Sequence, residues 1–310
     1  MAFTLSRSGQ NNNAGDDKAL FLKVFSGEVL TAYEENNIMM GLHRVRTIKS
    51  GKSASFNYTG KSSSGYHTPG TAWDSTQFPV SEKIISIDQI LFAAHSFYDL
   101  DDAMKHFDVR SEASTQMGRE LAKQADIKLM QVGLLGARAS TIISGGNGGT
   151  ELTNANYDTD AATLASGIFA LAQSFDEKDV PKNDRYLVLK PQQYYLLAQD
   201  TNQINKDWDG AGSYSKGKVL EIAGITILMS NNLPQSNVSA VTGENNTYNG
   251  DFSNTVGFGF QRDGLGTVKL LDLQMEMSRE HNEFADIVSA RYAQGHGYLR
   301  PECLAELKTA

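Results

Sequence analysis

The chain has 310 residues, of which 40% are hydrophobic and 21% charged, and its formal net charge is −8. At roughly 150 residues per domain this length suits one large domain or two ordinary ones, and the composition excludes a disordered polyelectrolyte and a membrane protein. The acidic balance argues against a surface that coats nucleic acid, and the single cysteine, Cys303, excludes both an intramolecular disulfide and a cysteine-based zinc cluster.

The first 90 residues predict a polar arm, a short helix and an extended hairpin. Residues 1–17 are polar and indicate a flexible arm, whereas apolar residues recur at helical spacing over 18–33. The stretch 49–75 is rich in Ser and Gly and has too few apolar residues to pack a core of its own. We therefore expect a hairpin that leaves the body of the protein, followed by one buried strand over 83–93.

A long helix is predicted over about 99–138. No proline interrupts this segment, and its apolar residues follow a step of three to four. Asp99, Asp101 and Asp102 stand at its start, where carboxylates cap free N–H groups and complement the helix dipole. A helix of about 40 residues would be ~60 Å long, against a mean of about 11–12 residues in globular proteins, so we expect a flat, extended body.

The remainder of the chain mixes helices and strands without an internal repeat, so the fold class is α+β. A helix is predicted near 160–175, and a short one starts at Pro191 because proline is tolerated at the first helical position. Strands are predicted at 186–190, 222–230 and 268–278, with a polar loop over 234–254.

Three segments approach known ligand-binding loops without completing them. Gly212–Lys218 fits G-x-x-x-x-G-K, but Val219 stands where a magnesium-binding Ser or Thr is needed, and Gly51–Ser53 has only the end of the motif. Asn205–Gly210 matches the first half of a calcium loop, but the twelfth position is Lys216 where a bidentate Glu is required. We interpret all three as polar surface loops.

No catalytic set assembles in the sequence. The Asp99, Asp101 and Asp102 cluster could bind a metal or act as paired carboxylates, but its place at a helix start favours capping. The six histidines are scattered, and there is no G-x-S-x-G nucleophile elbow. Cys303 is interpreted as a small packed or surface thiol. The chain is therefore not predicted to be an enzyme, and no cofactor or metal is expected.

Charge differs sharply between the hairpin and the long helix. Between Gly41 and Trp73 there are five basic residues and no acidic one, whereas Asp99–Asp126 carries seven acids against four bases. The two segments could attract each other between subunits; the alternative is a hairpin that contacts only water and salt. The candidate inter-subunit residues are Arg44, Arg46, Lys49, Lys52, Phe56, Tyr58, Lys61 and Trp73 of the hairpin against Asp99, Asp108, Glu112 and Glu120 of the helix.

In its order of elements the chain resembles the major capsid proteins of short-tailed (podovirus, Autographivirus-like) bacteriophages, which have the Hong Kong 97-like fold. Six blocks carry the resemblance and run in family order along most of the chain. They are DKALFLKVFSGEVLTAYEENN (17–37), HRVRTIKSGKSASF (43–56), SEKIISID (81–88), YDLDDAMKHFDVRSEASTQMG (98–118), GTVKLLDLQMEM (266–277) and DIVSARYAQGHGYLRPE (286–302).

The resemblance implies a division of the chain into the parts of that fold. The implied parts are an N-terminal arm at 1–45, an extended loop with flanking strands at 46–90, a peripheral domain at 91–182 with its spine helix at about 99–138, an axial domain at 183–265, and a return of the chain to the peripheral domain at 266–310.

The resemblance also implies a structural role. Copies would assemble in the host bacterial cytoplasm as hexamers and pentamers of an icosahedral virion head, around double-stranded DNA that they contact without sequence specificity and with no membrane. A portal protein and a scaffolding protein would direct closure, and because some relatives carry a scaffolding segment before the arm, we expect a separately encoded scaffold here. No isopeptide cross-link is predicted, although Lys52 and Lys61 lie in the loop that some relatives use for one. The alternatives are an encapsulin-like compartment that encloses cargo enzymes and, from another class, a metal- or nucleotide-binding enzyme.

Overall fold

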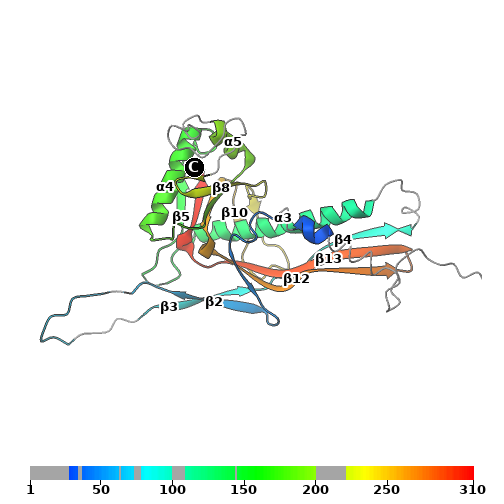
Figure 1. Cartoon of the computed structure of the whole chain (residues 1–310), viewed down its shortest axis with the longest axis horizontal. Coiled ribbons are helices and arrows are strands. Elements are labelled where there is room, and N and C mark those ends of the chain that lie inside the picture. The colour runs from blue at the N-terminus through cyan, green and yellow to red at the C-terminus, as the bar shows by residue number, and fades with distance from the viewer. Residues whose placement is uncertain are drawn as a thin grey trace, which may run out of the picture. The chain divides into compact units, whose positions relative to one another are not determined.

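The computed structural model describes residues 28–33, 37–62, 64–72, 78–99, 109–143, 145–199 and 221–310. The chain forms two compact units, the first from 1–38, 90–125 and 271–293, the second from 39–89, 126–270 and 294–310. Three elements continue from one unit into the other (Figure 1): helix α3 (Val109–Ala137) and strands β12 (Leu265–Glu280) and β13 (Ala285–Tyr298).

A six-stranded sheet forms the centre of the second unit. Its strand order is β5-β14-β11-β6-β8-β7. The strands are β5 (Thr150–Thr153), β6 (Arg185–Leu189), β7 (Glu221–Ile222), β8 (Ile225–Met229), β11 (Thr255–Gln261) and β14 (Leu304–Lys308).

Strand β11 is buried along its whole length because its two faces pack against different helices. Phe258 and Phe260 join the core cluster that contains Leu129 and Leu134 of α3. On the other face, a Cβ at Gly259 would lie 2.7 Å from Leu171 of α4 (Ala161–Glu177), so glycine lets the helix approach. The alternation of Phe and Gly along β11 thus follows the two-residue period of a strand.

The predicted helices and strands near 160–199 are confirmed. Helix α4 starts after Asp160, whose carboxylate caps it by accepting a hydrogen bond from the backbone N–H of Thr163 at 3.0 Å. Its apolar face buries Leu164, Ile168 and Phe175. Strand β6 and helix α5 (Pro191–Gln199) follow where the sequence predicts a strand and a proline-started helix.

The predicted long helix is shorter in the described part of the chain. Helix α3 covers Val109–Ala137, so its end is confirmed to within one residue, whereas 100–108, including Asp101 and Asp102, lie outside the described residues. The carboxylate of Asp99 forms an ion pair with the guanidinium of Arg279 on β12. Asp99 thus has a tertiary partner that the capping prediction did not foresee.

Two predicted single strands are each divided, and both predictions were wrong in the same way. The segment 83–93 is not one buried strand but the end of β3 (Val80–Ser86) and the start of β4 (Leu91–Tyr98), and only Ile85 and Ile87 in it are buried. The segment 222–230 is a hairpin of β7 and β8, turned by Ala223 and Gly224 with φ of 53° and 74°. Both segments are rich in apolar residues, so the sequence pattern did not reveal the break in either of them.

The expected extended hairpin is present. Strand β2 (Ser53–Thr59) pairs antiparallel with β3, from Ser53 opposite Ser86 to Thr59 opposite Val80, and the two form a sheet of their own (Figure 1). Every described residue from 61 to 72 is exposed. The described part of the connection between the two strands therefore lies outside the core of its own chain, whereas Ala54, Tyr58 and Ile85 on the strands are buried.

Another sheet has four strands in the order β1-β12-β13-β4. In it β1 (Arg44–Thr47) runs parallel to β12. The alternating segment 268–278 is confirmed as part of β12. The expected polar loop at 234–254 is mostly irregular. The short elements are β9 (Asn237–Val238), β10 (Gly250–Asp251), η3 (Arg262–Gly264), η4 (Pro301–Cys303) and one helical turn at 28–33.

Gly295 of β13 is expected to be indispensable for seating the root of the hairpin. A Cβ at this position would lie 1.9 Å from the carbonyl oxygen of Ser86, a backbone atom that cannot rotate away. Gly295→Ala should therefore lower the free energy of unfolding by about 3 kcal/mol, measured by urea denaturation of the unassembled chain. Gly65→Ala, where a Cβ would meet nothing within 4 Å, is the matched control and should change stability by less than about 0.5 kcal/mol. Equal stability of the two variants would contradict the packing described here.

Candidate inter-subunit surface

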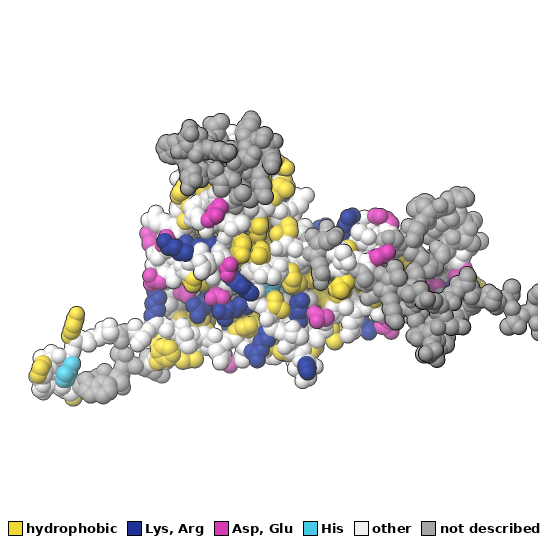
Figure 2. Space-filling view, viewed as in Figure 1, with side chains coloured by type: hydrophobic (Ala, Val, Ile, Leu, Met, Phe, Trp, Pro, Cys, Tyr) yellow, Lys and Arg dark blue, Asp and Glu magenta, His cyan; other side chains and the backbone are white. Residues whose placement is uncertain are grey.

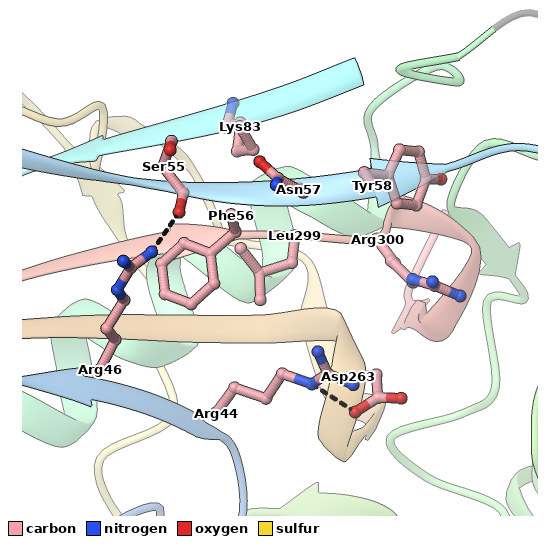
Figure 3. Close-up of a pocket in the computed structure, with 10 residues that line it drawn as sticks. All are labelled: Arg44, Arg46, Ser55, Phe56, Asn57, Tyr58, Lys83, Asp263, Leu299 and Arg300. Atoms are coloured by element: carbon pink, nitrogen blue, oxygen red, sulfur yellow. Dashed lines mark hydrogen bonds and ion pairs between the residues drawn. The ribbon is translucent and has the colours of Figure 1, made fainter. Parts of the chain in front are cut away.

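A pocket of about 190 Å³ lies at the root of the hairpin in the second unit (Figure 3). It is built from strands far apart in the sequence, because β1, β2 and β3 meet there with η3 and the segment after β13. Its lining residues are Arg44, Arg46, Ser55, Phe56, Asn57, Tyr58, Lys83, Asp263, Leu299 and Arg300.

Four cations line this pocket and one carboxylate faces them. Arg44 donates from Nε to Asp263 Oδ1 at 2.7 Å, and Arg46 donates from Nη1 to the carbonyl oxygen of Ser55 at 2.6 Å (Figure 3). The ammonium of Lys83 lies 4.1 Å from the ring centroid of Tyr298, at cation–π distance. The cations are thus oriented by single contacts that leave most of their N–H donors available.

The aromatic residues predicted for the inter-subunit surface have different surroundings. Tyr58 is buried within its own chain, with the guanidinium of Arg300 at 5.1 Å from its ring centroid, and burial raises the pKa of its hydroxyl. Phe56 is half-buried and forms a wall of the pocket, whereas Trp73 lies outside the described residues. Of the three, only Phe56 therefore offers a described apolar surface.

The remaining predicted cations divide into paired and unpaired ones. Lys61 forms an ion pair with Asp179 at 2.5 Å, and that hydrogen bond raises the pKa of its ammonium. Lys49 and Lys52 are exposed and form no ion pair with any described residue. Figure 2 shows Lys and Arg side chains gathered on one face of the second unit. The cations with no partner of their own are those at 49 and 52.

Two of the predicted acidic residues of the long helix accept hydrogen bonds from neutral glutamine side chains. Glu112 accepts a hydrogen bond from Gln116 at 2.8 Å, and Glu120 accepts one from Gln124 at 2.9 Å. Asp126, counted among the acids of this segment, is buried and accepts a hydrogen bond from the backbone N–H of Met39 at 3.2 Å. It therefore does not contribute to a surface charge. Asp108 lies outside the described residues.

A carboxylate that the sequence analysis missed holds the root of the hairpin. Asp88 accepts hydrogen bonds from the backbone N–H groups of Asn245 at 2.7 Å and Asn246 at 3.2 Å, and from the hydroxyl of Tyr248. Both amide side chains return a bond, from Asn246 to Ser86 O at 2.6 Å and from Asn245 to Ile87 O at 2.5 Å. Burial raises the pKa of Asp88 despite these donors. The polar break in the apolar segment 83–93 was the available signal.

A second buried network joins β1, β12 and β13 through two histidines. Because the carbonyl oxygen of Met39 can only accept, His43 donates to it from Nδ1 at 2.9 Å. The Thr267 hydroxyl then donates to His43 Nε2 at 2.7 Å and accepts from His296 Nδ1 at 2.9 Å. This order of protons requires a neutral His43 ring, because its Nε2 accepts a hydrogen bond, whereas His296 only donates from Nδ1. Burial lowers the pKa of His43 to about 4 and that of His296 to about 3.

The described residues contain no ligand set that supports the alternative of a metal- or nucleotide-binding enzyme. Within the described ranges no three His, Cys, Asp or Glu side chains are grouped to hold a metal ion. Of the three near-miss loops, 205–210 and 212–218 lie outside the described residues, whereas Gly51–Ser53 leads into strand β2. Cys303 is buried, which raises the pKa of its thiol to about 12, as expected of a packed thiol. No helix in the described ranges has the length and apolar character that crossing a bilayer requires.

Solved structures with this fold are capsid shells. The capsid of cyanophage P-SCSP1u matches 100% of this chain and 99% of its own, with a TM-score of 0.82 and 40% identity. The mature capsid of bacteriophage PhiM1 matches 89% of this chain and 87% of its own, with a TM-score of 0.74 and 19% identity. The molecule is thus of the class of structural, shell-forming capsid subunits with the Hong Kong 97-like fold.

Sequence comparison gives the family. The Gp10A-like major capsid protein family matches residues 55–308. The major capsid protein of Escherichia phage T7 is 33% identical over an alignment of 319 residues that covers 93% of this chain and 91% of the relative. The major capsid protein of Enterobacteria phage T3 is 32% identical over 324 residues, covering 96% and 93%. The chain belongs to this family of phage major capsid proteins.

This membership confirms several predictions made from the sequence. The α+β Hong Kong 97-like fold, the structural role in an icosahedral phage capsid and the location in the virion are confirmed. The relatives are structural capsid proteins, so the prediction that the chain is not an enzyme is confirmed as well. A virus-like particle from Pyrococcus furiosus shares the fold at 14% identity and a TM-score of 0.59, which is a likeness of fold alone.

Proposed function

We propose that this chain forms the wall of a phage head as hexamers and pentamers, in which each copy lays its β2–β3 hairpin on a neighbour. The observation that carries the proposal is the exposure of the hairpin: Phe78, Val80 and Ile84 have more than half of their surface accessible. Fixing a residue costs about 1–2 kcal/mol, and a segment with no core of its own needs contacts elsewhere to offset that cost. A neighbouring copy supplies them at each equivalent position of the shell.

The cations at the hairpin root are proposed to guide this contact electrostatically. Lys49 and Lys52 have no ion-pair partner in the described part of their own chain, and Glu112 and Glu120 of α3 are bound only by glutamine amides and, for Glu120, a lysine at 4.0 Å. Opposite charges on two copies steer their association and select the register. Arg44, Lys61 and Asp99 are proposed to act mainly within the chain, since each has an ion-pair partner there.

Reversal of two hairpin charges should impair assembly and leave the fold intact. In Lys49→Glu/Lys52→Glu two exposed, unpaired side chains change sign, so we expect the melting temperature of the unassembled chain to stay constant while the yield of closed shells falls about tenfold. Sedimentation of assembly reactions at low and physiological salt measures the yield. Lys182→Glu, a single reversal on an exposed lysine distant in sequence, is the control and should assemble normally. Normal assembly of the double variant at both salt concentrations would refute the electrostatic contact.

We propose a domain layout that family membership supports. In it 1–45 is the arm, 46–90 the extended loop, 91–182 and 266–310 the peripheral domain, and 183–265 the axial domain. The sheet that contains β6, β8 and β11 supports a packed body for the axial segment, and it also includes β5 and β14 from the flanking segments. Hexamer and pentamer centres would be formed by this body.

The proposed partners are further copies of the chain, a scaffolding protein, a portal protein and packaged double-stranded DNA. Copies of the chain follow from the capsid relatives. The net charge of −8 supports a wall that does not adhere to the phosphate backbone, because attraction to phosphate comes from unpaired Lys and Arg patches. DNA is therefore proposed to be enclosed rather than bound with sequence specificity.

The test of this function is the size of the particles formed when the chain is co-expressed with the scaffolding gene of its phage. Light scattering and negative-stain microscopy should show closed shells that are much larger than a monomer or a single hexamer. A stable monomer or small oligomer under the same conditions would contradict the proposal.

A further inference from the structure

The pocket at the hairpin root has more positive charge than its own chain neutralises. Arg44, Arg46, Lys83 and Arg300 line it, and Asp263 is its one carboxylate. A nearby acid, Glu302, lies 3.8 Å from the guanidinium of Arg300. This local excess of cations occurs in a chain with 36 acidic and 28 basic residues. Like charges held together cost free energy unless an anion joins them, so the pocket is built to receive a negative group.

The geometry favours a protein side chain as that group. Guanidinium groups present planar sets of N–H donors that match a carboxylate. Figure 3 shows Phe56 and Leu299 on the wall of the pocket between Arg46 and Arg300, so the anion should carry apolar surface with it. A volume of about 190 Å³ admits one or two side chains but not a helix. A short, projecting, acidic and aromatic turn satisfies all three requirements.

The chain itself contains such a turn between β12 and β13. Glu280, Glu283 and Phe284 are exposed at the end of this long strand pair, and the two glutamates form no ion pair with any described residue. Phe284 has 69% of its surface accessible, and its φ of 51° belongs to the turn. Two carboxylates beside an aromatic ring complement four cations beside an apolar wall. In a shell each pocket would have other copies of the chain around it.

We propose that the pocket at the hairpin root binds the Glu280–Phe284 turn of a second copy of this chain, with Arg46 and Lys83 pairing with its carboxylates and Phe284 covering Phe56 and Leu299. The inference rests on the proposed function, since it requires copies to meet in a shell. It adds a contact distinct from that of Lys49 and Lys52 with helix α3, because it uses different residues on both partners.

The test is a charge swap in the full chain co-expressed with its scaffolding gene. Arg46→Glu/Lys83→Glu and Glu280→Lys/Glu283→Lys should each lower the yield of closed shells about tenfold, and the combination of all four substitutions should restore it to within about twofold. Lys182→Glu, a charge reversal at an exposed site outside both the pocket and helix α3, is the control and should assemble normally. Circular dichroism of the unassembled chains reports whether each variant folds.

Each other outcome overturns the inference. Normal assembly of the pocket variant would show that the pocket has no assembly partner. If the variant with all four substitutions still assembles poorly, the turn is not the partner of the pocket. If the pocket variant assembles normally but retains less DNA, the pocket serves phosphate instead. Should a pocket variant fail to fold, Arg46→Gln/Lys83→Gln removes both positive charges without adding negative ones and should show a smaller assembly defect that depends little on salt. Failure of the unaltered chain to form shells would refute the proposed function, which these variants do not test.

Discussion

Between pH 6.5 and pH 4 the free energy of unfolding of the unassembled chain is expected to fall by several kcal/mol. In the folded chain burial lowers the pKa of His43 to about 4 and that of His296 to about 3, whereas the histidines of the unfolded chain titrate near 6.5. The unfolded state therefore binds more protons in this window, so stability is complete above pH 6.5 and is lost as the pH falls toward these values. At 1.36 kcal/mol per pKa unit, each histidine contributes about 3 kcal/mol by pH 4.

The physical cause is the order of hydrogen bonds through Thr267. A protonated His43 would point a second N–H at the Thr267 hydroxyl, which already accepts from His296, so its own proton would lose its acceptor. Asp88 has the opposite effect on the free energy of unfolding. Its pKa is raised in the folded chain, so its protonation offsets part of the stability that the histidines lose at acidic pH.

Urea denaturation at pH 7, 5.5 and 4.5 measures this dependence. His43→Gln/His296→Gln removes both buried titrating groups, so its stability at pH 7 should be lower but should change much less across the same range. A free energy of unfolding that is equal at pH 7 and pH 4.5 for the unaltered chain would show that these rings do not carry the acid sensitivity.

Asp88→Ala should lower the free energy of unfolding by about 2–4 kcal/mol and loosen the root of the hairpin. Removal of the carboxylate leaves the backbone N–H groups of Asn245 and Asn246 and the Tyr248 hydroxyl without their acceptor. Because Asp88 is half-buried and Tyr248 is buried, water can replace the carboxylate only in part, so much of the desolvation penalty of these donors is expressed. Urea denaturation gives the stability, and hydrogen exchange at the backbone N–H of Ile87 reports the loosening.

Two variants bracket this prediction. Asp88→Asn keeps one acceptor oxygen, so its loss should be about half that of alanine. Asp179→Asn removes the charge of a mostly exposed carboxylate that pairs with Lys61 and keeps a residue type that tolerates its φ of 58°, so its effect should be below about 0.5 kcal/mol. If Asp88→Ala were no more destabilising than Asp179→Asn, the network would have no role in holding the hairpin.

Elements whose signal is local were predictable from the sequence. The apolar step of α3, the Asp160 cap of α4 and the alternation of β12 each depend on residues within a few positions of one another. The turn at Ala223–Gly224 was missed because alanine rarely takes a positive φ, and the apolar residues on both sides looked continuous. Strand β11 was missed because glycine alternates with its apolar residues, and the reason for glycine there is a helix from another part of the chain.

The site could be predicted only in part, because its partners are distant in sequence. The basic hairpin was recognisable from composition, but the ion pairs of Arg44 with Asp263 and Lys61 with Asp179 span 219 and 118 residues. Lys83 and Arg300 gave no signal as isolated cations, and only the fold brings them together with Arg46. Asp88 fell inside the predicted strand 83–93, and its partner Asn246 lies 158 residues later.

The central claim is that the hairpin of each copy contacts a neighbouring copy. A high-resolution cryo-electron microscopy reconstruction of the assembled shell tests it most directly, because it shows every subunit beside its neighbours. We predict that β2, β3 and their connection lie on an adjacent subunit, with Lys49 and Lys52 facing carboxylates of that subunit. A shell in which the hairpin contacts only its own chain or solvent would contradict the account.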